Sequence, residues 1–258
     1  MARQSTGGIE IMPPGRFRAS ESILLEGDIE GVEYAGRRID QFVTVGATLT
    51  NCTFSETAIA HVQFGSGTKQ TIFRDCRFSA VCLNMDVGGN CRYERCVFER
   101  ATFRSWMCMA VELIDCRFTG EIEDSILSAA VPPSLAAMVG RNTNELRRND
   151  FSRASLKNTV FRGGVDLLDQ SLPSGPGCIL IREPVAVLRA AKAALHEQAE
   201  GQRKDAAALH AVFGMWEMEL ELGQRQLWVQ RSDLDAIVGD VVAGNLWDAL
   251  AAANGTSS

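Results

Sequence analysis

Apolar residues recur at every fifth position from Leu24 to Phe118, with one irregularity at Gly65 to Thr68. Before the irregularity, these positions are Leu24, Ile29, Tyr34, Ile39, Thr44, Leu49, Phe54, Ile59 and Phe64. After it, they are Phe73, Phe78, Leu83, Gly88, Tyr93, Phe98, Phe103, Cys108, Leu113 and Phe118. A period of five matches neither a helix, with about 3.6 residues per turn, nor a strand, with a period of about 2. It matches a chain that turns a corner every five residues and closes a square coil after about twenty, which indicates a solenoid.

A small residue stands two positions before many of these apolar residues. The clearest triplets are Cys52-Thr53-Phe54, Cys76-Arg77-Phe78, Cys96-Val97-Phe98, Ala101-Thr102-Phe103 and Cys116-Arg117-Phe118. In this motif the chain resembles the pentapeptide-repeat family, over residues 22–123 and again at Phe151, Leu156 and Phe161. The resemblance implies a right-handed quadrilateral β-helix, so the expected fold is mainly β, with an α-helical C-terminal segment after the solenoid.

A coil of twenty residues predicts which side chains stack on one another inside the solenoid. One expected column is Tyr34, Phe54, Phe73, Tyr93 and Leu113, and the next is Ile39, Ile59, Phe78, Phe98 and Phe118. A third is Leu24, Thr44, Phe64, Leu83 and Phe103, followed by Glu123. Because burying a carboxylate is costly, we expect the regular coil to end near Glu123. The fourth column passes through the irregularity and Gly88, where we expect bulges, an exposed opening or a docked partner segment.

The pattern divides the chain into five parts. These are a flexible segment or cap at 1–21, the β-helix at 22–123, an insertion at 124–148, a final coil and cap at 149–183, and a helical region at 184–254. In the insertion, Ser134 is the expected cap of a short helix. Cys178 to Ile181 is an expected strand.

Three apolar stripes predict three helices in the C-terminal region. They are Leu188, Ala191 and Leu195; Leu209, Val212, Phe213, Trp216 and Leu220; and Leu234, Ile237, Val238, Val241 and Leu250, the last preceded by Ser232 as cap. Such helices should form a small bundle, pack on the solenoid or form a homodimer.

The eight cysteines predict neither a disulfide nor a metal site. Cys52, Cys76, Cys91, Cys96 and Cys116 occupy the small inward position of the repeat, where a thiol behaves as a compact apolar group. Their spacings are not those of zinc ligands. The sequence has no apolar run long enough for a membrane span and no secretory segment at its N-terminus, so we expect a cytoplasmic protein.

No group of residues predicts catalysis. His61 is at an outward corner, while His196 and His210 lie on helices, and none is near a recognisable nucleophile. Gly65-Ser66-Gly67-Thr68-Lys69 lacks the spacing of a phosphate-binding loop. We therefore expect no enzyme activity, no cofactor and no bound metal.

Charge supplies the remaining functional indication. The chain carries a net charge of −6. Residues 21–64 hold Arg37 and Arg38 against the acids Glu21, Glu26, Asp28, Glu30, Glu33, Asp40 and Glu56. This acidity argues against direct nucleic-acid binding, which requires lysine and arginine. Glu26, Asp28, Glu30 and Glu33 are the candidate partner-binding residues.

The expected function is that of a non-enzymatic protein-interaction scaffold. The family resemblance implies an alternative, a DNA mimic that modulates DNA gyrase or topoisomerase IV and gives quinolone resistance or self-immunity to a topoisomerase poison. The chain departs from that pattern in its charge-balanced second half, its insertion and its long helical region.

Overall fold

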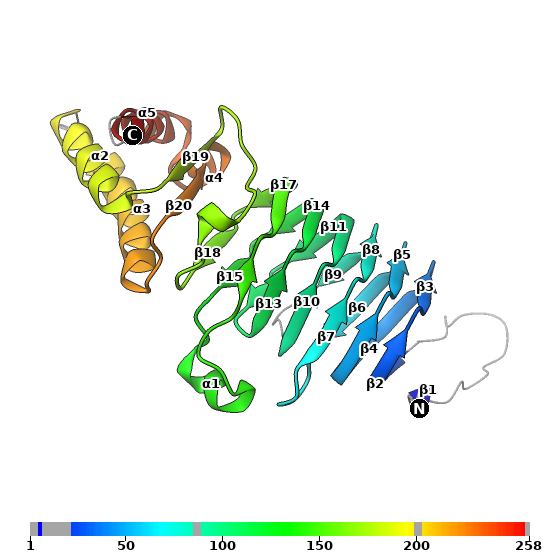
Figure 1. Cartoon of the computed structure of the whole chain (residues 1–258). Coiled ribbons are helices and arrows are strands. Elements are labelled where there is room, and N and C mark those ends of the chain that lie inside the picture. The colour runs from blue at the N-terminus through cyan, green and yellow to red at the C-terminus, as the bar shows by residue number, and fades with distance from the viewer. Residues whose placement is uncertain (1–4, 7–21, 85–88, 199–202, 256–258) are drawn as a thin grey trace. The chain divides into compact units, whose positions relative to one another are not determined.

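The computed structural model describes every residue except 1–4, 7–21, 85–88, 199–202 and 256–258. The chain forms two compact units (Figure 1). One comprises Met1–Val160 with Asp169–Leu172, and the other comprises Phe161–Leu168 with Pro173–Ser258.

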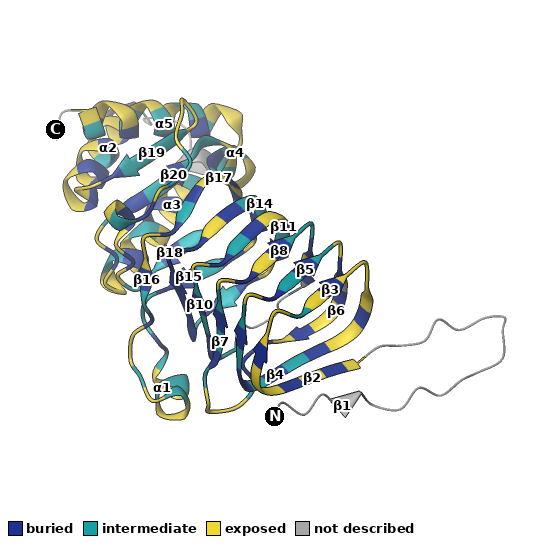
Figure 2. Ribbon diagram, turned by 45° about the vertical axis from the view of Figure 1, so that its right-hand side comes forward, coloured by how far each residue is buried: buried dark blue, intermediate teal, exposed yellow. Residues whose placement is uncertain are grey.

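The first unit is a coil of short parallel strands. Its strands are β2 (Ser22–Glu30), β3 (Glu33–Ala35), β4 (Arg38–Thr50), β5 (Thr53–Ser55), β6 (Ala58–Gln63), β7 (Thr71–Arg74), β8 (Arg77–Ser79), β9 (Cys82–Asn84), β10 (Cys91–Glu94), β11 (Val97–Arg104), β12 (Met107–Cys108), β13 (Val111–Ile114), β14 (Arg117–Glu123), β15 (Ile126–Ser128), β16 (Leu146–Arg147) and β17 (Asp150–Lys157). Each strand pairs in parallel with the equivalent strand of the neighbouring coil, while β1 (Ser5–Thr6) pairs antiparallel with β2. The predicted β-helix is confirmed, and Figure 2 shows buried and exposed residues alternating along its strands.

A ladder of aromatic rings fills one side of the coil. Neighbouring rings lie 4.6–5.0 Å apart and nearly parallel in the order Tyr34, Phe54, Phe78, Phe98, Phe118 and Phe151. The expected stacking of Phe54 on Phe73 is therefore wrong. Phe73 stands opposite Leu49, and Phe78 opposite Phe54. The irregularity lengthens one coil, because residues 65–70 form a loop between β6 and β7 before the period resumes.

The coil continues beyond Glu123, so the predicted end of the regular coil is also wrong. At Gly120 the chain takes a shorter step, which turns Ile122 inward beneath Leu156. Glu123 consequently points outward and lies 3.5 Å from Arg104. The coil therefore does not have to bury the Glu123 carboxylate, and the reason for predicting its end there does not apply.

A similar shift occurs at the start of the coil. Leu24, expected to point inward, is 38% exposed, while Leu25 is buried. The pairing of β2 with β4 changes register between Glu26 and Asp28, where Gly27 adopts φ +78°. The extra residue belongs to β4, between Val45 and Thr48, where Gly46 adopts φ +54°. A glycine tolerates this left-handed conformation, which a β-bulge needs.

The predicted inward position of the cysteines is confirmed, since Cys52, Cys76, Cys91, Cys96 and Cys116 are all buried. At one corner of the coil, each thiol contacts a backbone carbonyl of the preceding coil. The Sγ atoms of Cys76 and Cys96 lie 3.4 Å from the carbonyl oxygens of Leu49 and Phe73, respectively. Burial raises the pKa of the Cys96 thiol well above its usual value. These thiols act as small core groups.

The insertion carries one short helix, α1 (Pro133–Val139). Its cap is Pro132, with Pro133 as the first helical residue, and no side chain caps it. The prediction of Ser134 as cap is wrong because proline, whose nitrogen carries no hydrogen to satisfy, already suits the first helical position.

The second unit contains four helices and two strands within its described residues. They are β19 (Cys178–Ile181), α2 (Pro184–Gln198), α3 (Arg203–Glu221), β20 (Leu227–Gln230), α4 (Arg231–Val238) and α5 (Asp240–Gly255). Short elements β18 (Val160–Arg162) and the 3-10 helix η1 (Leu167–Asp169) precede them. The strand expected at Cys178 is confirmed, and it pairs antiparallel with β20, which the sequence did not predict.

The expected third helix is divided in two. Gly239 has φ +80° and separates α4 from α5, and α4 is capped at Gln230 and not at Ser232. Ile237 and Val241, expected in the core, are 50% and 77% exposed. Helix α5 instead buries Ala243, Leu246, Leu250 and Ala253.

The described helices include none with the length and apolar character of a membrane span.

Candidate interaction surface on the first coils

The four candidate carboxylates lie at the beginning of the coil. Glu26, Asp28 and Glu30 are on β2, and Glu33 opens β3. All four are exposed, whereas Ile29 between them is buried. Glu26, Asp28 and Glu30 share the outward face because side chains two positions apart on a strand point to the same side. Figure 2 shows this run of exposed residues along β2.

The residues of the neighbouring coil that stand opposite these acids are uncharged. Asp28 stands opposite Thr48, Glu30 opposite Thr50 and Glu33 opposite Thr53. The nearest cations in the same columns, Arg74 and Arg77, are one strand further on. Because adjacent strands lie about 4.8 Å apart, roughly 10 Å separates these backbones from those of the acids. Among the described residues, none of the four carboxylates takes part in an ion pair.

Later coils neutralise their acids. Lys157 lies 3.0 Å from Glu121, Arg74 lies 2.9 Å from Glu94, and Arg95 lies 2.7 Å from Asp75. The hydrogen bonds from Arg95 hold the pKa of the Asp75 carboxyl below its usual value. The four acids of β2 and β3 therefore lack the ionic partners that these acids of later coils have.

No protein-family model matches the chain, and neither does any curated protein. A structure of QnrB1, described as a plasmid-mediated fluoroquinolone resistance protein, is similar at 15% identity over 57% of this chain and 79% of its own, with a TM-score of 0.36. The pentapeptide repeat protein Rfr23 from the cyanobacterium Cyanothece 51142 is similar at 10% identity over 58% of this chain and 90% of its own, with a TM-score of 0.26.

These similarities are distant, so the fold is assigned from the structure of the coil. The Cys-x-Phe triplets place their phenylalanines in one stacked ladder and their thiols at one corner, in parallel coils closed by four short steps. The chain therefore folds as a quadrilateral parallel β-helix, the fold that the sequence resemblance implied.

The sequence interpretation did not predict a polar network on the outside of the coil. Arg92 donates to Glu94 at 2.6 Å, to Glu112 at 3.2 Å and to Glu145 at 3.0 Å. Burial lowers the pKa of Arg92, but the hydrogen bonds to these carboxylates outweigh it and raise the pKa above its usual value. The twenty-residue spacing of Arg92 and Glu112 could have shown part of this network. Glu145 belongs to the insertion, whose position the period does not predict.

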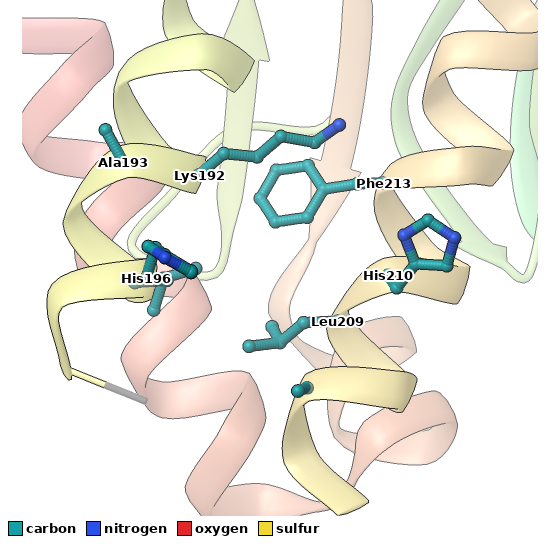
Figure 3. Close-up of a pocket in the computed structure, with 8 residues that line it drawn as sticks. Lys192, Ala193, His196, Leu209, His210 and Phe213 are labelled. Carbon is teal, nitrogen blue, oxygen red and sulfur yellow. The ribbon is translucent and has the colours of Figure 1, made fainter. Parts of the chain in front are cut away.

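Of the three histidines, one belongs to the first unit and two belong to the second. His61 is exposed on β6, in the first unit. His196 on α2 and His210 on α3 are also exposed, and both line a cavity of about 450 Å³ in the second unit (Figure 3). Within the described parts of the chain, no group of His, Cys, Asp or Glu side chains could hold a metal ion.

Proposed function

We propose that the protein is a non-enzymatic interaction scaffold that binds a basic protein surface through Glu26, Asp28, Glu30 and Glu33. The observation that carries this proposal is the contrast between these unpaired acids and the ion-paired acids of later coils. Unpaired exposed carboxylates attract a complementary positive surface, which increases association rate and selectivity.

The rigidity of the coil supports the same function. The strands that carry the acids are fixed from inside by fully buried residues such as Leu25, Tyr34 and Leu49. A preorganised surface loses little conformational freedom on binding, so more of the interaction free energy remains as affinity.

A second candidate is a type II topoisomerase, DNA gyrase or topoisomerase IV, as the partner. The acids are held at strand positions of a stiff rod without neutralising cations, as phosphates are on DNA. In this candidate mechanism the first coils would occupy the basic surface on which the enzyme holds DNA. The proposal also includes dimerisation through the C-terminal helices, where the exposed Ile237 and Val241 would be covered by a second copy.

Two matched variants test the acidic surface. One carries Glu26→Gln, Asp28→Asn, Glu30→Gln and Glu33→Gln. The other carries Asp75→Asn, Glu99→Gln, Asp115→Asn and Glu121→Gln, which removes the same number of charges from ion-paired positions. Affinity capture from an extract of the source cells, with identification by mass spectrometry, should retain a basic protein on the wild type and the control but not on the first variant. Retention should also fail near 1 M salt, where the screening length is about 3 Å.

Equal retention by the first variant would contradict the proposed surface.

For the topoisomerase candidate, purified gyrase and topoisomerase IV are assayed with and without a quinolone. Inhibition or drug protection by the wild type and the control, but not by the first variant, would support it. No effect on either enzyme would exclude this candidate and leave the scaffold proposal to the capture experiment. Light scattering of the purified protein decides between a monomer and a dimer.

A further inference from the structure

Helix α3 carries apolar residues on two sides. Its inner side packs in the core of the second unit through Leu209, Val212, Phe213, Trp216 and Leu220. Its outer side is apolar as well, although a surface helix normally has polar residues there. Met215, Met218 and Leu222 are 43%, 45% and 47% exposed on this outer side. The helix therefore presents large apolar side chains to solvent.

The outer apolar residues have the spacing of a contact between two helices. Steps of three and four residues alternate along the stripe formed by Ala208, Ala211, Met215, Met218 and Leu222. This alternation aligns side chains along one side of a helix, and it is the pattern by which one helix packs on another. Leu222 lies one residue beyond the end of α3, but its amide donates to the Met218 carbonyl at 3.0 Å and so continues the helical turn. The stripe fits a second helix.

The inner side of α3 is fixed, so the helix cannot rotate to bury the stripe in its own core. Val212 and Phe213 fill that core and are 0% and 3% exposed. The buried carboxylate of Glu219 accepts hydrogen bonds from Arg162 Nε at 2.8 and 3.0 Å. A rotation that buried Met215 would break this ion pair and expose both core residues. The stripe consequently stays on the outside.

The stripe is complementary to itself in side-chain size. Its first half holds the small residues Ala208 and Ala211, and its second half holds the large residues Met218 and Leu222. An antiparallel pair of α3 helices centred on Met215 sets large residues of one copy against small residues of the other. Such an arrangement fills space as close packing requires, and it also opposes the two helix dipoles. A parallel pair would set small against small and large against large.

We propose that two copies of this chain form a two-fold dimer through the outer side of α3. Met215 lies on the two-fold axis, and both copies contribute the same residues, as an isologous contact requires. This interface is formed by α3 and not by the exposed Ile237 and Val241 of α4 and α5, and it does not depend on the acidic surface. Each dimer carries two acidic surfaces, which increases the avidity for a partner with two basic sites.

Sedimentation velocity of the full-length protein over a range of concentrations tests the proposal. We expect a reversible change from monomer to dimer, because a stripe about 21 Å long gives a contact at the low end of interface sizes, below about 1,200 Å². Met215→Lys places two like charges on the two-fold axis, so it should weaken dimerisation at least about tenfold. Because Met215 is exposed, this variant should keep its fold, which circular dichroism checks.

Two exposed residues outside α3 supply the matched controls. Met138 is 45% exposed in the first unit, and Val241 is 77% exposed on α5. Met138→Lys and Val241→Lys should dimerise as the wild type does. The proposal is overturned if the wild type stays monomeric at every concentration, if folded Met215→Lys dimerises normally, or if Val241→Lys weakens dimerisation as much as Met215→Lys does.

Cysteine cross-linking tests the antiparallel orientation. The parent variant for this experiment is Cys82→Ser, which removes an exposed native thiol. Added to it, Met215→Cys should form an intermolecular disulfide on mild oxidation with diamide, since the two-fold axis brings this position of both copies together. Leu222→Cys should not, because position 222 lies seven residues from the axis and the two thiols would be about 21 Å apart. Cross-linking through Leu222→Cys, or none beyond that of the parent through Met215→Cys, would overturn the proposed pairing.

Discussion

Arg95 donates two hydrogen bonds to the carboxylate of Asp75, from Nε at 2.7 Å and from Nη2 at 2.8 Å. The two residues occupy the same corner of successive coils, and both have a left-handed backbone, with φ +51° and +54°. Arg148 repeats this geometry on Asp115 further along the corner. The repeat thus places acid and base in one column, where each residue lies within reach of the next coil.

This pairing predicts a pH-dependent contribution to stability. The Arg95 hydrogen bonds lower the pKa of Asp75, so the contribution is present above the usual aspartate pKa of about 3.9 and is lost as pH falls through the lower pKa of the folded state. Because both side chains are well exposed, Arg95→Gln should lower the free energy of unfolding at pH 7 by only about 0.2–1 kcal/mol. Urea unfolding should show this difference at pH 7 and a smaller one as pH falls below about 3.9.

Arg100 is the matched control for this experiment. It is an exposed arginine with φ +51°, and no carboxylate among the described residues pairs with it. Arg100→Gln should therefore have little effect at either pH. If both variants lose the same stability, or if the Arg95 effect does not depend on pH, the pairing does not contribute as argued.

The aromatic ladder predicts a large effect of truncating Phe98. Its ring is buried between those of Phe78 and Phe118, at 4.7 Å from each. Phe98→Ala should lower the free energy of unfolding by about 3–5 kcal/mol, because the side chain leaves a cavity that the stiff coil cannot close. Denaturant unfolding measures this change. Arg117→Ala, on the exterior of the same coil, should cost no more than about 1 kcal/mol, and similar losses for the two variants would contradict the stacking.

The five-residue period predicted whether a side chain points into or out of the coil better than it predicted which residue of the next coil that side chain stacks on. Phe73 lies nine residues after Phe64, which can mean two steps of five with one residue missing or one step of five with four residues added. Both readings keep Phe73 inward, so the apolar pattern does not distinguish them. Only the pairing of Leu49 with Phe73 shows that residues were added.

The same limit applies to the candidate surface. Exposure of Glu26, Asp28, Glu30 and Glu33 followed from their outward positions, and the structure places them on one end of the coil. Their lack of ionic partners depends on the threonines of the next coil, which can be identified only once the register is known. The split of the last predicted helix depends on the left-handed backbone of Gly239, and an apolar stripe does not encode it.

Gly120 should tolerate no side chain. It has φ +111°, and a Cβ built there would lie 2.2 Å from the carbonyl oxygen of Ala101. Gly120→Ala should therefore cost more than about 3 kcal/mol, since backbone must move in two adjacent coils. The control Gly27→Ala has a left-handed φ but no atom within 4 Å of the added Cβ, so it should cost only about 1–2 kcal/mol. Thermal unfolding compares the two, and equal losses would show that conformation alone, without the clash, sets the cost.

Arg141 should hold the insertion against the coil. Its guanidinium donates to Asn90 Oδ1 at 2.7 Å, to the Ala110 carbonyl at 2.7 Å and to Asn144 Oδ1 at 3.1 Å. Arg141→Met should cost about 1–3 kcal/mol for each buried group left without a partner. Because the lost bonds join the insertion to the coil, we expect the faster opening to be local. Hydrogen exchange followed by mass spectrometry should show faster exchange at residues 129–145, with little change in β10 or β13.

Arg147→Met is the control for Arg141. Arg147 lies 3.1 Å from Glu145 at the surface, with 46% of its side chain exposed, and such a pair contributes at most about 1 kcal/mol. Exchange at residues 129–145 should then remain close to that of the wild type. If Arg141→Met also leaves this exchange unchanged, the insertion is held by its other contacts, such as the hydrogen bonds from Asn144 to the carbonyls of Met109 and Ser128, and Arg141 is not its anchor.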